Sequence, residues 1–99
     1  MITIIAKFSL KPQKGDEFIK AAIKLTRETR KEKGCLSYKI LKSDADENNY
    51  TFIEEWLNDA AIEAHNNSKH FNGFLDEIKE MTASEIKIER FVKIPSVFF

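Results

Sequence analysis

The chain has 99 residues and a mass of 11.5 kDa, which leaves room for one domain over residues 1–99 and excludes a second. Its 42% apolar and 32% charged residues exclude the disordered and low-complexity classes. Because 16 basic and 16 acidic residues cancel, nucleic acid and membrane surfaces are not expected as partners. Cytoplasm is the expected compartment, since the one cysteine cannot form an internal disulfide and residues 1–10 do not resemble a signal peptide.

The first half of the chain predicts a strand, a helix and a hairpin. Residues 1–10 alternate between apolar and polar with period two, which indicates a strand. Helical spacing begins at Asp16, and we expect that helix to end at Gly34 in the left-handed conformation typical of glycine just past a helix. The segments 36–41 and 50–57 alternate again and are joined by a polar loop, so they predict a hairpin.

The second half predicts a broken helix and a last strand. Asn58 or Asp59 can cap a second helix, and the poor helix formers at 66–68 interrupt it. Ser68 can cap the new start, and period two returns over residues 86–94. The order β-α-β-β-α-β predicts an α+β, ferredoxin-like fold, in which both helical regions cover one face of an antiparallel sheet.

The other face of that sheet mixes apolar residues with charges. It is too apolar to lie in water across its whole width, so we expect it to pack against a second copy of the chain in a homodimer. Its apolar residues are Ile5, Leu41, Ile53, Leu57 and Phe91.

One carboxylate stands among aromatic residues on the strand over 50–57. Tyr50, Phe52, Glu54 and Trp56 share a face, whereas Glu55 points the opposite way. Burial between rings would raise the pKa of Glu54 and suit it to acid–base chemistry. The alternative is a structural carboxylate that accepts a hydrogen bond from a backbone amide or a helix N-terminus.

Two histidines lie on either side of the helix break. His65 ends the first helical piece and His70 begins the next, and a neutral imidazole can remove a proton from a phenol. On an unbroken helix the two would diverge by about 140°, so only the break lets them face one cavity. Capping or exposed histidines are the alternative reading. A metal triad with Glu54 is disfavoured because the spacing is not H-E-x-x-H.

These residues together resemble the small antibiotic biosynthesis monooxygenase family, over nearly the whole chain. The resemblance implies a dimeric α/β barrel in which the open sheet faces meet, with a substrate cavity between the sheet and helices of each protomer. The most specific parts are Gly34-Cys35-Leu36-x-Tyr38, Phe52-x-Glu54-x-Trp56, Ala64-His65 and Ser68-x-His70-Phe71, with Pro12, Gly15 and Phe18 in register.

The resemblance, which is closer to the quinol-oxidising branch, implies oxidation of a quinol, phenol or anthrone by O₂ without metal, flavin or haem. His65 would be the general base, and Glu54 its orienting or second acid–base group. Family members often have an acidic residue where Lys7 stands and a proline where Lys69 stands. The residues that the resemblance implies for substrate binding are Trp56, Phe52, Tyr50, Tyr38, His70 and Phe71.

Other functions remain open from the sequence. A related branch that isomerises a phosphorylated dione shares Glu54 and the two-histidine segment, and a non-catalytic dimeric ligand-binding module needs no reaction at all. Haem-degrading relatives pair an asparagine on the first strand with a tryptophan and a histidine in the helical region, where this chain has Phe8, His65 and Leu75, so haem is disfavoured. An RNA-recognition motif shares the element order but needs a basic-Gly-aromatic opening that the third strand lacks.

Overall fold

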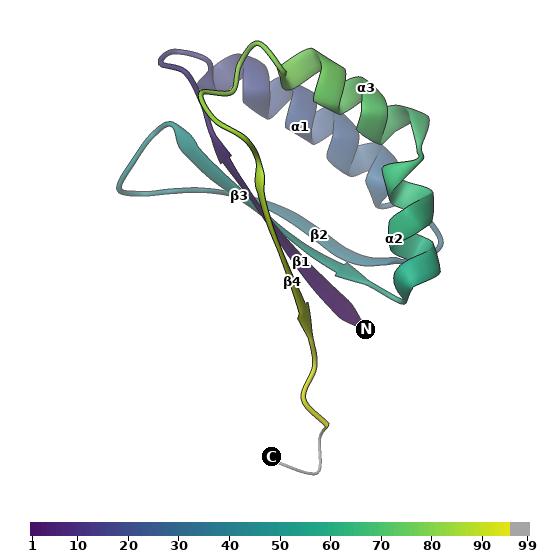
Figure 1. The fold of residues 1–99 in the computed structure, drawn as a ribbon. Helices are drawn as coiled ribbons and strands as arrows, with labels where there is room; N and C mark the ends of the chain where they lie inside the picture. Colours follow the sequence, from purple (N-terminus) through teal and green to yellow (C-terminus); the bar gives the residue numbers. More distant parts are fainter. Residues whose placement is uncertain (96–99) are drawn as a thin grey trace.

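The computed structural model describes residues 1–95, so residues 96–99 of the predicted domain lie outside the described part. The helices lie on one side of the sheet (Figure 1). The elements in chain order are β1 (Ile2–Ser9), α1 (Gly15–Thr29), β2 (Cys35–Lys42), β3 (Asn49–Trp56), α2 (Asp59–Asn66), α3 (Lys69–Ile78) and β4 (Lys87–Val92).

The strands form one antiparallel sheet in the order β2-β3-β1-β4. β1 is central, pairing with β3 in a register that sets Ile4 opposite Glu54, while Tyr38 on β2 lies opposite Glu54 from the other side. This is the ferredoxin-like α+β fold that the element order predicts, and the predicted hairpin of β2 and β3 is confirmed.

The core lies between the sheet and α1, where the apolar face of β1 packs against the apolar stripe of the helix. The alternation predicted for residues 1–10 is confirmed, because its even-numbered residues are buried and its odd-numbered ones are not. A set of aromatic rings fills the middle of this core: Phe8, Phe18, Tyr50, Phe52 and Phe74, with centroid separations of 4.5–6.1 Å.

The predicted end of the first helix is wrong. α1 ends at Thr29, and Gln13, not Gly34, is the residue with positive φ within residues 1–95. The chain leaves the helix through tight turns instead, in which the Glu32 amide donates to the Thr29 carbonyl over 3.0 Å. Glycine is required at 34 for a different reason: a Cβ there would collide with the Cβ of Ala61, so β2 can begin close beneath α2.

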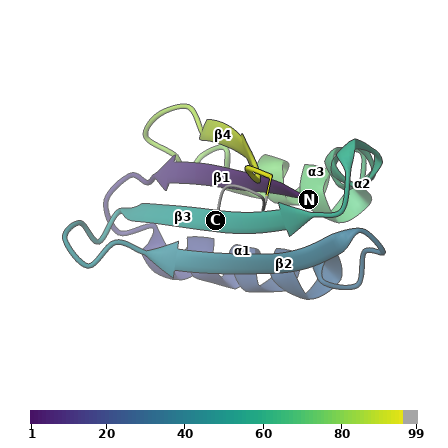
Figure 2. The same ribbon diagram turned by 90° about the horizontal axis from the view of Figure 1, so that it is seen from below.

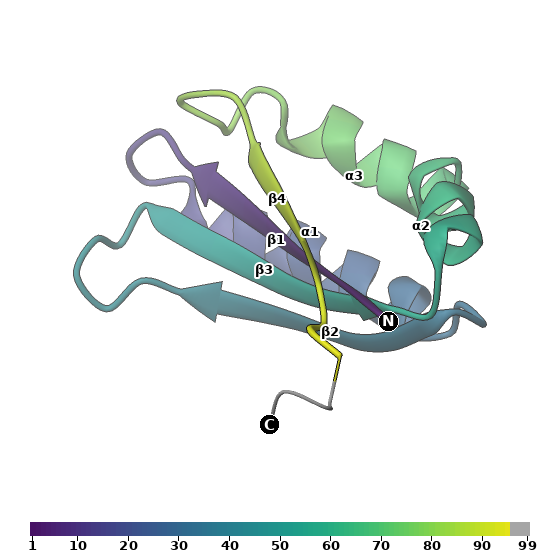
Figure 3. The same ribbon diagram turned by 60° about the horizontal axis from the view of Figure 1, so that its bottom comes forward.

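The predicted break in the second helical region is confirmed, and Figure 3 shows α2 and α3 as separate helices. Both predicted caps are present. The side chain of Asn58 accepts a hydrogen bond from the Ala61 amide, and that of Ser68 accepts one from the Phe71 amide.

The sheet face without helices is seen in Figure 2, where the strands lie in front of the helices. Its apolar residues are placed as predicted: Leu41, Leu57 and Phe91 are exposed, and Ile5 and Ile53 are half-buried. Within the described part of the chain, β4 pairs only with β1 and is exposed along its length. Within residues 1–95, no helix is both long and apolar enough to cross a membrane.

Candidate functional site

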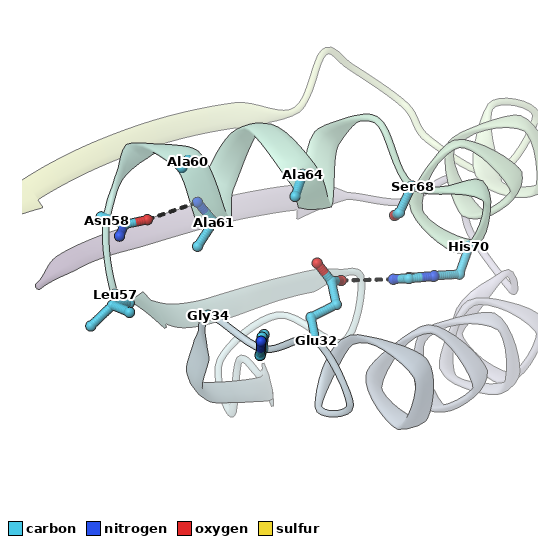
Figure 4. A pocket seen from close by; sticks show the side chains of 10 residues that line it. Glu32, Gly34, Leu57, Asn58, Ala60, Ala61, Ala64, Ser68 and His70 are labelled. Carbon is cyan, nitrogen blue, oxygen red and sulfur yellow. Dashed lines mark hydrogen bonds and ion pairs between the residues drawn. The ribbon is translucent and has the colours of Figure 1, made fainter.

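Two histidines and a glutamate meet at one end of the helix-covered side of the sheet. The Nδ1 atom of His65 and the Nε2 atom of His70 each lie 2.7 Å from the same oxygen, Oε2 of Glu32. Glu32 comes from the turn after α1, whereas His65 belongs to the last turn of α2 and His70 to the first turn of α3. Figure 4 shows Glu32 and His70 pointing toward each other.

The helix break is what brings both histidines to one atom. A continuous helix would point side chains five positions apart about 140° away from each other. Here the Ser68 hydroxyl donates to the His65 carbonyl over 2.7 Å and caps α3 through the Phe71 amide, so the chain changes direction between the two rings. The short turn that begins at Thr29 then brings Glu32 beneath them.

The hydrogen bonds fix the tautomer of His65. As a carboxylate, Glu32 can only accept, so His65 donates from Nδ1 and its Nε2 keeps a lone pair. That Nε2 is buried and has no hydrogen-bond partner among the described residues. Burial lowers the pKa of His65, although the nearby Glu32 opposes this effect. The lowered pKa favours the neutral ring, which is the form that a general base requires.

Aromatic rings surround His65 and keep water away from it. The ring centroids of Phe71, Trp56 and Tyr38 lie 4.6, 4.7 and 5.7 Å from that of His65, which is only 2% exposed. The hydroxyls of Tyr38 and Thr29 are two further buried polar atoms with no hydrogen-bond partner among the described residues, and the Thr29 hydroxyl is close enough to oppose the rise in the pKa of Tyr38. Burial, and next the charge of Glu54, raise the pKa of Tyr38, so it remains a neutral phenol.

Glu54 lies in this aromatic surround but bonds neither histidine in residues 1–95. Its Oε1 accepts a hydrogen bond of 3.0 Å from the indole Nε1 of Trp56. Burial raises the pKa of Glu54 to about 7, the indole hydrogen bond opposes this, and the charge of Glu32 adds to it. The carboxyl is therefore able to give or take a proton near neutral pH.

Sequence reasoning missed Glu32. It stands in the run Arg30-Lys31-Glu32-Lys33, which resembles a solvated helix end. The one signal in the sequence is the negative charge of Glu32, because a helix C-terminus favours cations over anions. Its contacts with α2 and α3 are non-local and leave no trace in the local pattern.

An open groove of about 510 Å³ leads from the surface to the Glu32–His70 pair. Gly34, Ala61 and Ala64 are among the residues that line it (Figure 4). The predicted cavity between sheet and helices is filled in this structure, since Trp56 and Phe52 are each only 1% exposed.

The structure therefore groups some of the predicted site residues and separates others. His65, His70, Trp56, Tyr38 and Phe71 form one ring cluster, and Glu54 adjoins it through Trp56. Phe52 touches that cluster through Tyr38, with centroids 5.7 Å apart. Tyr50 packs on Phe18 at the far end of the core, next to Gly15.

Comparisons with known proteins agree with this fold. The sequence profile of the antibiotic biosynthesis monooxygenase family matches residues 1–77, a range that contains Glu32, His65 and His70. A Bacillus subtilis protein named "Putative monooxygenase YcnE" is 32% identical over 90 residues, which cover 91% of this chain and 95% of that protein.

Two solved structures are similar in sequence as well as in fold. A crystal structure described as an antibiotic biosynthesis monooxygenase has a TM-score of 0.91 and 27% identity, covering 96% of this chain and 100% of that one. A conserved protein from Methanosarcina mazei has a TM-score of 0.90 and 30% identity, covering 94% and 92% of the two chains.

Proposed function

This chain belongs to the antibiotic biosynthesis monooxygenase family, and from that premise we propose that it oxidises a small aromatic substrate of quinol, phenol or anthrone type with O₂, without a cofactor. The observation that carries the proposal is His65, a buried neutral imidazole with a free lone pair on Nε2, held by Glu32 and walled by aromatic rings.

The reaction begins with proton transfer. His65 Nε2 removes a proton from the substrate, and the anion formed is electron-rich enough to pass one electron to O₂. The substrate radical and superoxide recombine as a peroxide, which loses water as its C–H bond breaks and leaves a quinone carbonyl. One oxygen atom of O₂ enters the product and the other leaves as water.

Each neighbour of His65 has a role in this scheme. Glu32 is a positioning residue, because it fixes the tautomer and stabilises the imidazolium that forms. Glu54, with a pKa of about 7, supplies the proton that the departing oxygen needs. The unpartnered Tyr38 hydroxyl is a candidate donor to a substrate oxygen.

The ring cluster accounts for the choice of an aromatic substrate. Trp56, Phe71 and Tyr38 offer faces on which a planar ring can stack, and they exclude the water that would quench an anion or a peroxide. Because these rings are packed together here, substrate entry requires them to part on the side of the groove at Glu32 and His70.

The direct test is O₂ uptake by EDTA-treated protein with a reduced naphthoquinol and with a small anthrone, corrected for autoxidation. We expect turnover in the wild type and in the control Glu55→Gln, which changes a carboxylate on the opposite face, and a loss of at least 100-fold in His65→Ala. Uptake equal to the blank would contradict the monooxygenase, and uptake unchanged in His65→Ala would remove His65 from the mechanism.

An isomerase is the second candidate, and the same pair of groups favours it. A neutral His65 and a Glu54 with a pKa near 7 can move a proton from one carbon of a phosphorylated dione to another without any oxygen. Conversion of such a dione under strict anaerobiosis, together with no O₂ uptake from quinols, would select this function.

The assembly that we propose is a homodimer through the open sheet face. The exposed Leu41, Leu57 and Phe91 support it, because apolar residues gathered on an exposed face mark an interaction surface. Light scattering should give twice the chain mass of 11.5 kDa, and Phe91→Glu should shift the protein toward monomer. A monomeric wild type at assay concentration would contradict this assembly.

A further inference from the structure

We propose that Glu32, His65 and His70 form a binding site for one divalent cation of the zinc class. One ligand atom from each of the three lies within 4.8 Å of the others. Two imidazole nitrogens and one carboxylate oxygen are the ligand set of three-residue zinc sites that keep a fourth position open for water. The site stands on these contacts alone, while its effect on turnover, described below, rests on the proposed function.

The identity of the carboxylate is decisive. The triad that the sequence spacing disfavours contains Glu54, which is hydrogen-bonded to Trp56 and, among residues 1–95, to neither histidine. The structure places Glu32 between the two rings instead, with one oxygen shared by both nitrogens. Side chains that converge in this way from three separate segments have most of the geometry of a metal site before any ion arrives.

Small side-chain movements complete the geometry. Ligands about 2.0–2.2 Å from a tetrahedral ion lie about 3.3–3.6 Å apart, whereas the two contacts of Glu32 Oε2 are 2.7 Å. Opening each contact by about 0.6–0.9 Å makes room for the ion. The side chains of Glu32 and His70 are 15% and 26% exposed and can make this adjustment, while His65, at 3%, stays fixed.

The groove supplies the way in and the fourth ligand. Glu32 and His70 line it and His65 does not, so an ion enters from solvent on their side and keeps a water molecule there. Imidazole with one carboxylate selects Zn²⁺, Co²⁺ or Ni²⁺ over Mg²⁺ and Ca²⁺, which prefer oxygen ligands. Lys33 also lines the groove, and its charge limits affinity without blocking the ligands.

Metal binding would switch the base off. The ion bonds His65 at Nδ1, so the proton of the neutral ring moves to Nε2, the atom that otherwise holds the lone pair. A zinc-loaded protein should therefore lose the oxygenase reaction that the proposed function assigns to it.

Co²⁺ is the probe for the test, because a four-coordinate Co²⁺ site absorbs visible light. Untagged, EDTA-treated and dialysed protein is titrated with CoCl₂, and ZnCl₂ is then added to displace the Co²⁺, with calorimetry giving the stoichiometry. We expect saturation at one equivalent, and affinity at least tenfold weaker in Glu32→Gln and in His70→Ala. Both variants alter partly exposed side chains, and circular dichroism checks that they fold.

Two matched variants complete the design. Glu28→Gln changes an exposed carboxylate one turn away in sequence, and Glu54→Gln changes the buried carboxylate on β3, so both should bind Co²⁺ as the wild type does. No saturable absorption, or equal binding in wild type, Glu32→Gln and His70→Ala, would overturn the site. Co²⁺ binding in a protein that consumes no O₂ even after EDTA treatment would refute the proposed function and leave the site standing.

Discussion

The two ends of the space between sheet and helices are equally buried but differ in chemistry. At one end Phe8, Phe18 and Phe74 pack ring on ring, while at the other His65 and Glu54 are enclosed to a similar degree. Each group buried at the apolar end stabilises the folded state. At the polar end, desolvation of the ionisable groups lowers the stability of the fold. Stability is thus concentrated at one end, and the candidate reactive groups lie at the other.

The sharpest way to test the apolar end is Phe18→Ala. Phe18 is fully buried and contacts four other aromatic rings, so its removal should lower the free energy of unfolding by about 3–5 kcal/mol. Urea denaturation followed by circular dichroism measures this. Ile23→Ala, at an exposed position of the same helix, is the control and should change it by less than about 0.5 kcal/mol.

The polar end should respond in the opposite direction when Glu54 loses its charge. A rise in pKa from 4.5 to about 7 means that the folded chain holds the proton more tightly than the unfolded chain does. The stability contributed by the protonated form is then complete below pH 4.5, falls as the pH rises from 4.5 to 7, and is lost above 7. The loss is about 3 kcal/mol, at 1.36 kcal/mol per pH unit.

Glu54→Gln keeps the acceptor for the Trp56 indole and cannot ionise. This variant should therefore match the wild type near pH 4.5 and be up to about 3 kcal/mol more stable at pH 8. Glu55→Gln on the opposite face is the matched control and should leave the pH dependence as in the wild type. If the stability of the wild type does not fall relative to that of Glu54→Gln between pH 5 and pH 8, then ionised Glu54 does not destabilise the fold.

Within the polar end, Glu32→Gln separates positioning from folding. An amide can offer His65 either its oxygen or its NH₂, so the tautomer is no longer fixed, and kcat should fall roughly 100-fold, which is about 2.7 kcal/mol in barrier height. KM should change little, since Glu32 bonds the two histidines and, within residues 1–95, has no hydrogen bond to Trp56 or Tyr38, on whose rings the substrate would stack. A rise in KM with kcat unchanged would contradict the positioning role, and Glu32→Asp tests whether a carboxylate partly restores kcat.

The fold follows from local patterns more completely than the site does. The alternation of β1, the caps at Asn58 and Ser68 and the break between α2 and α3 are all written in short stretches of sequence, and each is confirmed. The contact between Glu32 and His65 cannot be read from a short stretch of sequence, because it joins residues 33 positions apart. It also depends on a turn whose course was predicted wrongly. The histidines could be found from their residue type, whereas their acidic partner could not.

Gly34 carries the same lesson, and comparing it with Gly73 gives the smallest expected effects. At Gly34 an added methyl group would meet the Cβ of Ala61, so Gly34→Ala should push α2 away from the start of β2 and destabilise the protein by about 1–3 kcal/mol. Gly73 lies inside α3 with open space around its Cα, and Gly73→Ala should stabilise it by about 0.5–1 kcal/mol through helix propensity.

The double variant Gly34→Ala, Ala61→Gly then links this contact to the polar end. Removing the Ala61 methyl group frees the space that the new one occupies, so the pair should recover much of the stability lost in Gly34→Ala, less the cost of glycine inside α2. Because α2 carries His65, the single variant should also lengthen the His65–Glu32 contact and lower kcat, and the double variant should restore it. Urea denaturation and O₂ uptake on the same samples measure both effects. If kcat in Gly34→Ala equals that of the wild type while stability falls, the spacing of α2 and β2 supports the fold without tuning the base.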